Sequence, residues 1–279
     1  MINKNLIIIK ILIILLSINC IYAKTANKTT IFHKNRYRVI KFNGIPPHKT
    51  YKINNKNIYN IKPQKYTAKI PLLPKINTKP TPVKNYVFGI STTGIIIDST
   101  PLRYWHDMPA LNWEYNYFFK NDNTKIDDFN GHINKHGEYY YKGIPKTKNN
   151  KSKTQQLIGY AADGFPIYNE IIRKKNKQYT KLKSSYKIKK GNRTNGPNGK
   201  HNGQFNQDYI YTKKLGDLDI CNGKFGKTKE YKNGTYYYVL TSTYPYIPRC
   251  FRGTPNYSFN TLKKQNQKPK KQFMRNSNY

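Results

Sequence analysis

Residues 235–240 read Thr-Tyr-Tyr-Tyr-Val-Leu, a run of aromatic and β-branched side chains. Such side chains suit the pleated surface of a β-sheet, so the run predicts a strand. Residues 209–211 have the same character, and residues 113–119 begin with alternating apolar and polar side chains, which is typical of a half-buried strand. Long stretches with the period of a helix are scarce. The sequence therefore predicts a mainly β protein with a single sandwich- or barrel-like domain and few short helices.

Two segments of the chain resemble each other. Residues 89–97 (GISTTGIII) and 159–167 (GYAADGFPI) each read as a strand end, a tight turn closed by glycine, and a second short strand. Each segment is followed by a glycine and three tyrosines, at 137–141 and at 234–238. An internal duplication would give two related β-units that share one core. Chance similarity in a tyrosine-rich chain is an equally weighted alternative.

The first residues have the features of a secretory signal peptide. Lys4 supplies the positive start, a short apolar core follows, and Ala23 is a small residue at the expected cleavage site. An uncleaved membrane anchor is the alternative, but Lys10 interrupts an apolar run that falls short of the roughly 20 residues of a membrane span. A lipoprotein signal at Cys20 is a lesser alternative. We expect a periplasmic or secreted protein without a transmembrane span after removal of residues 1–23.

The rest of the chain divides into three parts. Residues 24–82 are rich in lysine, asparagine and proline and show little helix or strand period, so we expect an extended basic arm. Residues 262–279 are polar and basic, and we expect a disordered tail. Residues 83–261 lie between these segments and are long enough for one β domain with its own core.

The formal net charge of +38 suggests anionic partners. Only eight of the 51 basic residues are arginines, however, and asparagine, isoleucine and tyrosine are abundant together with lysine. Specific readers of nucleic acids usually rely on the planar fork of arginine. A drift in composition therefore explains the charge better than specific nucleic-acid binding. Salt-sensitive binding of polyanions or of the cell envelope through the basic arms remains an alternative function.

Cys221 and Cys250 are the only cysteines that follow the predicted signal peptide. A pair of cysteines in an exported protein predicts a disulfide. Closing a loop of this length is worth about 3–4 kcal/mol in the chain-entropy description. Two buried thiols, or a thiol pair on a metal ion, are the alternatives.

Five segments resemble, in their order along the chain, the motifs of the YHYH-domain family of exported bacterial proteins. They are residues 136–145, 159–168, 217–223, 234–241 and 244–250, and the resemblance runs from about Tyr86 to Phe259. The resemblance implies an exported domain, and it leaves the activity of that domain undefined.

The motif that names this family is altered in the chain. Tyr139 and Tyr141 keep the two tyrosines, whereas the histidine positions hold Tyr140 and Lys142. Alternate residues of a strand face the same side, so the histidines of relatives would share one site, suited to a metal ion or an anion. A lysine ammonium repels a metal ion, and we expect Lys142 to favour an anionic group instead.

The leading functional interpretation is ligand binding at a polar site lined by tyrosines, which offer large amphipathic surfaces. The ligand would be a small molecule or a component of the cell envelope. The candidate residues are Tyr139, Tyr140, Tyr141, Lys142 and Asp163.

A divalent metal is an open possibility at two places. His132 and His136 lie four residues apart next to Asp127 and Asp128, although two solvated loop histidines are the simpler interpretation. Asp217 and Asp219, with Asn222, could hold a hard cation such as calcium, but their spacing is not that of an EF-hand. A turn in which these side chains bond their own backbone is the alternative.

An enzyme is the rival class. An extracytoplasmic hydrolase or metal-dependent enzyme would use His132 or His136 with acidic residues near Asp163 or Asp217. The sequence has no nucleophile elbow, phosphate loop or zinc-protease motif. It therefore identifies no catalytic residue, and it leaves open whether the protein is an enzyme.

Overall fold

The computed structural model describes residues 26–49, 60–101, 103–119, 126–146, 154–173 and 178–265. The predicted signal peptide, with Cys20, lies outside these ranges, as do residues 266–279 of the predicted tail. Within the described ranges, no helix is both long and apolar enough to cross a bilayer.

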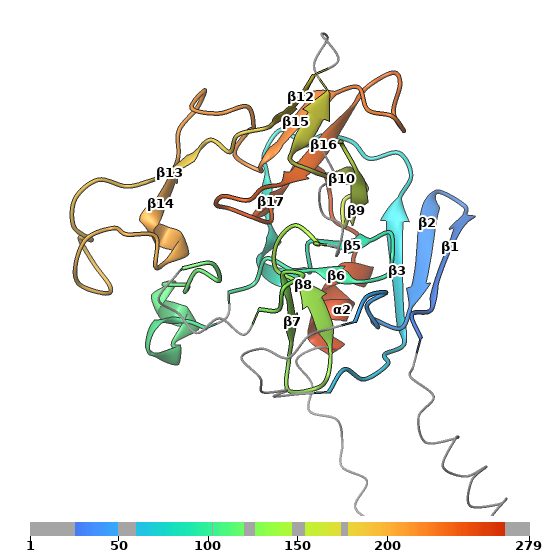
Figure 1. The fold of residues 1–279 in the computed structure, drawn as a ribbon, viewed down its shortest axis with the longest axis horizontal. Helices are drawn as coiled ribbons and strands as arrows, with labels where there is room; N and C mark the ends of the chain where they lie inside the picture. Colours follow the sequence, from blue (N-terminus) through green and yellow to red (C-terminus); the bar gives the residue numbers. More distant parts are fainter. Residues whose placement is uncertain are drawn as a thin grey trace, which may run out of the picture.

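An eight-stranded sheet forms the centre of the fold (Figure 1). Its order is β15-β16-β10-β9-β5-β6-β8-β7, and most neighbouring strands are antiparallel. The strands are β5 (Gly89–Ser91), β6 (Ile96–Ile97), β7 (Gly131–Ile133), β8 (Tyr139–Tyr141), β9 (Leu157–Ala161), β10 (Pro166–Asn169), β15 (Gly223–Gly226) and β16 (Thr235–Leu240). The prediction of a mainly β protein is confirmed. The described strands form an open sheet rather than a closed barrel, because β15 and β7 are its two edges.

The eight strands form two halves with the same topology. Each half has a short hairpin, β5–β6 or β9–β10. A tyrosine-rich strand runs parallel to the second strand of that hairpin, β8 beside β6 and β16 beside β10. An antiparallel edge strand, β7 or β15, completes the half.

The register between the halves fits an approximate two-fold axis. Where β5 and β9 meet, Gly89 pairs with Ala161 and Ser91 pairs with Gly159. An axis that exchanges the halves converts each of these pairs into the other. The approach is close, since a Cβ on Gly159 would lie 2.1 Å from the carbonyl oxygen of Ile90. The structure therefore favours an internal duplication over chance similarity.

The predicted extended arm is wrong for the described part of residues 24–82. These residues form a three-stranded antiparallel sheet of β1 (Thr29–Lys34), β2 (Tyr37–Phe42) and β3 (Tyr66–Pro71). Along β3, Tyr66, Ala68 and Ile70 are buried while the residues between them are exposed. This alternation is the period of a strand, and the neighbouring prolines and lysines concealed it.

The remaining elements are short. They are β4 (Thr81–Pro82), β11 (Ile171–Arg173), β12 (Tyr179–Lys181), β13 (Tyr186–Ile188), β14 (Tyr209–Tyr211), β17 (Cys250–Phe251), the 3-10 helices η1 (Val83–Asn85), η2 (Trp105–Asp107), η3 (Pro109–Leu111) and η4 (Asn206–Asp208), and the helix α2 (Ser258–Gln265). The predicted strands at 209–211 and 235–240 are confirmed. The predicted strand at 113–119 is wrong, since only isolated bridges form at Glu114 and Tyr115.

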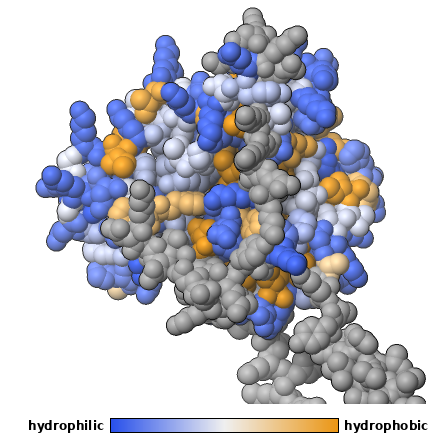
Figure 2. Space-filling model, viewed as in Figure 1, coloured by the Kyte–Doolittle hydropathy of each residue, from blue (hydrophilic) through white to orange (hydrophobic). Residues whose placement is uncertain are grey.

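One main core holds these parts together. It contains residues of both halves of the large sheet, of β2 and β3, and of α2. Leu262 of α2 is buried in this core, so the predicted disordered tail begins no earlier than the end of α2. At the surface, hydrophilic side chains cover much of the face seen in Figure 2, and hydrophobic ones form small patches.

Candidate functional site

The altered motif strand β8 lies in the interior of the domain. Tyr139 and Tyr141 are buried, and their rings pack edge to face. The Tyr141 hydroxyl lies 3.1 Å from Nε2 of His48, whose ring stacks on Phe129 at 3.9 Å. These two tyrosines therefore bind the segment before residue 50 to the sheet.

Lys142 is buried in a polar and aromatic environment of the protein itself. Its Nζ donates hydrogen bonds to Oδ2 of Asp98 at 2.8 Å and to the carbonyl oxygen of Thr100 at 3.0 Å. The rings of Tyr117 and Tyr140 lie 4.5 and 4.6 Å from the same nitrogen. Burial, with the negative charge of Asp98, raises the pKa of Tyr140, so its hydroxyl stays protonated. The expected anionic partner of Lys142 is thus an internal carboxylate.

The predicted metal ligands do not come together. His132 is buried against the ring of Tyr140, whereas the backbone of His136 bonds the side chain of Asn134. Asp217 lies in the other half and accepts a hydrogen bond from the backbone N–H of Lys183. No group of three or more His, Cys, Asp or Glu residues among the described residues could hold a metal ion.

Asp219 forms a turn in the second half of the sheet, and the first half has an equivalent turn. Its Oδ1 accepts hydrogen bonds from the backbone N–H groups of Cys221 and Gly223, and the Tyr236 hydroxyl donates to it at 3.1 Å. Asp127 holds the equivalent turn of the first half, and Tyr139 donates to it at 2.8 Å. The turn interpretation accounts for these contacts of Asp219.

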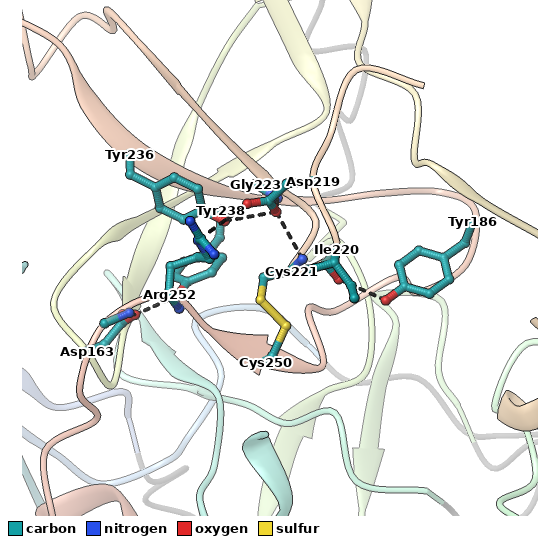
Figure 3. The surroundings of a disulfide bond; sticks show 11 residues. Asp163, Tyr186, Asp219, Ile220, Cys221, Gly223, Tyr236, Tyr238, Cys250 and Arg252 are labelled. Carbon is teal, nitrogen blue, oxygen red and sulfur yellow. Dashed lines mark hydrogen bonds and ion pairs between the residues drawn. A yellow bond between two sulfur atoms is a disulfide. The ribbon is translucent and has the colours of Figure 1, made fainter. Parts of the chain in front are cut away.

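The predicted disulfide between Cys221 and Cys250 is confirmed. The bond joins the turn of Asp219 to β17. Nε of Arg252 lies 3.6 Å from Oδ2 of Asp219 (Figure 3).

Asp163 is a buried carboxyl group that connects three segments. Oδ2 accepts hydrogen bonds from the Tyr238 hydroxyl at 2.5 Å and from the backbone N–H of Gly253 at 2.8 Å. Oδ1 accepts one from the N–H of Phe165 at 3.3 Å. Burial nevertheless raises the pKa of Asp163 to about 6, because the hydrogen bonds offset only part of the desolvation.

The raised pKa of Asp163 predicts a pH-dependent stability. Because the folded-state pKa exceeds the unfolded value, this group stabilises the fold below the unfolded pKa, and the contribution is lost as the pH rises through about 6. A shift of about two units corresponds to about 3 kcal/mol. Asp163→Asn removes the titration, so the stability of the unchanged protein relative to this variant should fall by that amount from about pH 4 to about pH 7.5. Urea unfolding of both proteins at each pH measures it, and a pH-independent difference would contradict the assignment.

A cavity of about 460 Å³ opens where β8, β10 and β16 end. Residues 143–146 follow β8, residues 169–171 join β10 to β11, and Thr241 and Ser242 follow β16. Ile144 and Thr241 hold equivalent positions after the two tyrosine runs. The cavity therefore lies between the ends of the two halves.

One wall of this cavity is polar and fixed. Glu170 is buried, and its Oε2 accepts hydrogen bonds from the N–H and the hydroxyl of Ser242 at 2.8 and 2.9 Å. Its Oε1 lies 2.5 Å from Nζ of the exposed Lys181. The side-chain amide of Asn169 donates a hydrogen bond to the carbonyl oxygen of Thr154 and accepts one from the backbone N–H of Gln156. The wall presents a carboxylate, an amide and a hydroxyl group on a rigid support.

Another part of the cavity lining is aromatic. The rings of Phe118 and Tyr246 lie 4.2 Å apart. The ring of Phe118 packs against Gly143, where no larger residue would fit, since a Cβ on Gly143 would lie 2.8 Å from Cζ of Phe118. Tyr246 has a φ of 58°, which is uncommon for a bulky residue, and its carbonyl oxygen accepts the N–H of Thr241. Such strained positions concentrate at functional sites.

The sequence prediction missed this cavity. None of its five candidate ligand residues, Tyr139 to Lys142 and Asp163, lines it. Four of these side chains are buried, and Tyr140 is half-buried. Tyr246 lies in a segment quoted for the family resemblance, but Phe118, Glu170 and Ser242 carry no sequence signal of a site.

These observations define the chain as a duplicated β domain with a cavity between the ends of its halves. A model of the YHYH protein family matches residues 67–253, and the chain belongs to that family. The resemblance in the sequence is therefore confirmed, and the match begins inside β3. A search of curated proteins and a search of solved structures each gave no match.

Proposed function

We propose that this chain is an exported ligand-binding domain whose cavity between β8, β10 and β16 takes a polar, uncharged ligand of the carbohydrate class. The observation that carries the proposal is a lining that combines the rings of Phe118 and Tyr246 with the fixed polar groups of Asn169, Glu170 and Ser242. Aromatic faces pack against the apolar faces of sugar rings, and fixed amide, hydroxyl and carboxylate groups bond sugar hydroxyls. Export rests on the predicted signal peptide.

The charges of the cavity favour an uncharged ligand. Glu170 pairs with Lys181, so the carboxylate already has a cation beside it. Lys146 is exposed at the edge of the lining. The cavity volume lies in the range of small-molecule sites and suits one or two sugar rings.

Binding is favoured over hydrolysis by the same lining. Most glycoside hydrolases use two carboxyl groups on opposite sides of the bond that they cleave. Among the described lining residues, Glu170 is the only one with a carboxyl group, and it is held by Ser242 and Lys181.

The test is saturation-transfer NMR with a panel of neutral mono- and disaccharides. We expect at least one to bind, and we expect Glu170→Gln to weaken it at least about tenfold, because the variant keeps the shape but loses the charged acceptor. Glu230→Gln is the matched control, since Glu230 is an exposed glutamate outside this lining. The proposal fails if no saccharide binds, or if the two variants bind equally well.

A further inference from the structure

A second cavity, of about 450 Å³, lies at the end of the β5–β6 hairpin. The β5–β6 and β9–β10 hairpins pair in the same register, with a glycine opposite an isoleucine in each. Ser99 and Thr100 come after β6 and line this second cavity. They correspond to Asn169 and Glu170, which line the first cavity, between β8, β10 and β16. The two cavities thus lie at corresponding ends of the two hairpins of the duplicated sheet.

The carboxylate of Glu114 is a fixed acceptor in the lining of the second cavity. Its Oε2 accepts hydrogen bonds from the Arg249 guanidinium and, at 2.8 Å, from the side-chain amide of Asn206. The backbone N–H of Glu114 donates to Oε1 of Gln207 at 2.8 Å. These contacts hold the carboxylate and give it a countercharge. No hydrogen bond from a described residue reaches Oε1 of Glu114, so this oxygen can still accept one.

Two donor groups line the same cavity. Burial, with the nearby charge of Glu114, raises the pKa of Tyr104, so the Tyr104 hydroxyl keeps its proton. The backbones of these two residues form a β-bridge. The side-chain nitrogen of Gln207 is the second donor, because the oxygen of that amide makes the bond to Glu114. Neither donor has a hydrogen-bond partner within the described part of the chain.

Apolar surface completes this lining. It comes from the ring of Tyr104 and from Pro82, Pro101 and Pro109. Such rigid rings can pack against the apolar face of a sugar ring. The acceptor and the two donors suit a ligand rich in hydroxyl groups, because each hydroxyl both donates and accepts hydrogen bonds. The open acceptor on Glu114 disfavours a phosphate or a carboxylate, which would bring a second negative charge beside it.

We propose that the second cavity is a second carbohydrate site, which takes a neutral saccharide independently of the first cavity. One chain then holds two saccharide units at once. Two sites on one chain raise the affinity for a polymer that carries many copies of the ligand, without any new contact. The proposed function concerns the first cavity alone, so each of the two sites can be tested without the other.

The test is the mapping of amide NMR shifts of the full-length, isotope-labelled protein on titration with the methyl glycosides of glucose, galactose, mannose and N-acetylglucosamine. We expect two sets of shifts, one that includes the amide of Glu114 and one that includes the amide of Glu170. Tyr104→Ala should weaken binding at the Glu114 set at least about tenfold and leave the other set unchanged, and Phe118→Ala should do the reverse. Tyr104→Phe keeps the ring and should weaken the Glu114 set less, by the loss of one donor. The matched control Tyr257→Ala, at an exposed tyrosine outside both linings, should change both sets less than about twofold.

The outcomes separate this proposal from the proposed function. Shifts at the Glu170 set alone would overturn the second site and leave the proposed function standing. Shifts at the Glu114 set alone, weakened by Tyr104→Ala, would support the second site and overturn the proposed function. Equal weakening of both sets by Tyr104→Ala and by Phe118→Ala would mean one coupled site and would overturn independent binding. Tighter binding of methyl glucuronide than of methyl glucoside at the Glu114 set would overturn the assignment to neutral saccharides.

Discussion

Lys142→Ala should lower the free energy of unfolding by about 3–5 kcal/mol, the usual loss when one partner of a buried ion pair is removed. The side chains of Lys142 and Asp98 are 2% and 12% exposed. Without the ammonium, the Asp98 carboxylate keeps its hydrogen bonds from Thr100 but loses this countercharge. Urea unfolding at neutral pH measures the loss.

A double-mutant cycle separates this effect from lost packing. Lys142→Met keeps most of the side-chain volume, so it should still destabilise strongly, because Asp98 then lacks the ammonium that donates to its Oδ2. Adding Asp98→Asn should recover a large part of that loss, since the remaining carboxylate charge is then absent. Lys187→Ala, at an exposed position of β13, should stay within about 0.5 kcal/mol. A loss below about 1 kcal/mol for Lys142→Ala would contradict the buried pair.

The fold class could be predicted from the sequence because the tyrosine-rich strands carry their own signal. In β16, aromatic and β-branched residues occupy every position but the last, and the strand is buried over almost its whole length. The sheet of residues 24–82 was missed for the opposite reason. In β3 buried and exposed residues alternate, but Ile40 and Ala68 lie among lysines and prolines, whose abundance suggests a chain without a core.

The duplication was visible in the sequence only as two similar turns. The structural support for it is the pairing of Gly89 with Ala161 and of Ser91 with Gly159, which joins segments far apart in the chain. The equivalent turns held by the carboxylates of Asp127 and Asp219 are likewise not recognisable in the sequence. The tyrosines that donate hydrogen bonds to them lie 12 and 17 residues further along the chain.

The candidate site was the least predictable part. The charged groups of Lys142 and Asp163 lie in segments of the family resemblance and so suggest ligands, yet each has its partners inside the protein. The cavity residues come from several separated segments, among them those of Phe118, Glu170 and Tyr246. Each of them looks ordinary in its local sequence, and only the folded chain brings them together.

The disulfide should contribute about 2–5 kcal/mol to stability, and its place in the repeat explains why. Cys221 follows Asp219 in the turn of the second half, at the position that Phe129 holds in the first. In the first half, Phe129 stacks on His48 and so fixes its turn without a covalent bond. In the second half, the bond to Cys250 performs this task.

Cys221→Ser combined with Cys250→Ser should therefore unfold at lower urea concentration, while the shape of the first half is unaffected. Closure of a loop with a sequence separation of 29 corresponds to about 3–4 kcal/mol in the chain-entropy description. A reducing agent supplies the matched control, since it should destabilise the unchanged protein by a similar amount and leave the double variant as it was. Titration of the denatured, unreduced protein should find almost no free thiol. Two reactive thiols per chain would instead mean that the Asp219 turn is held to β17 by packing and by Arg252 alone.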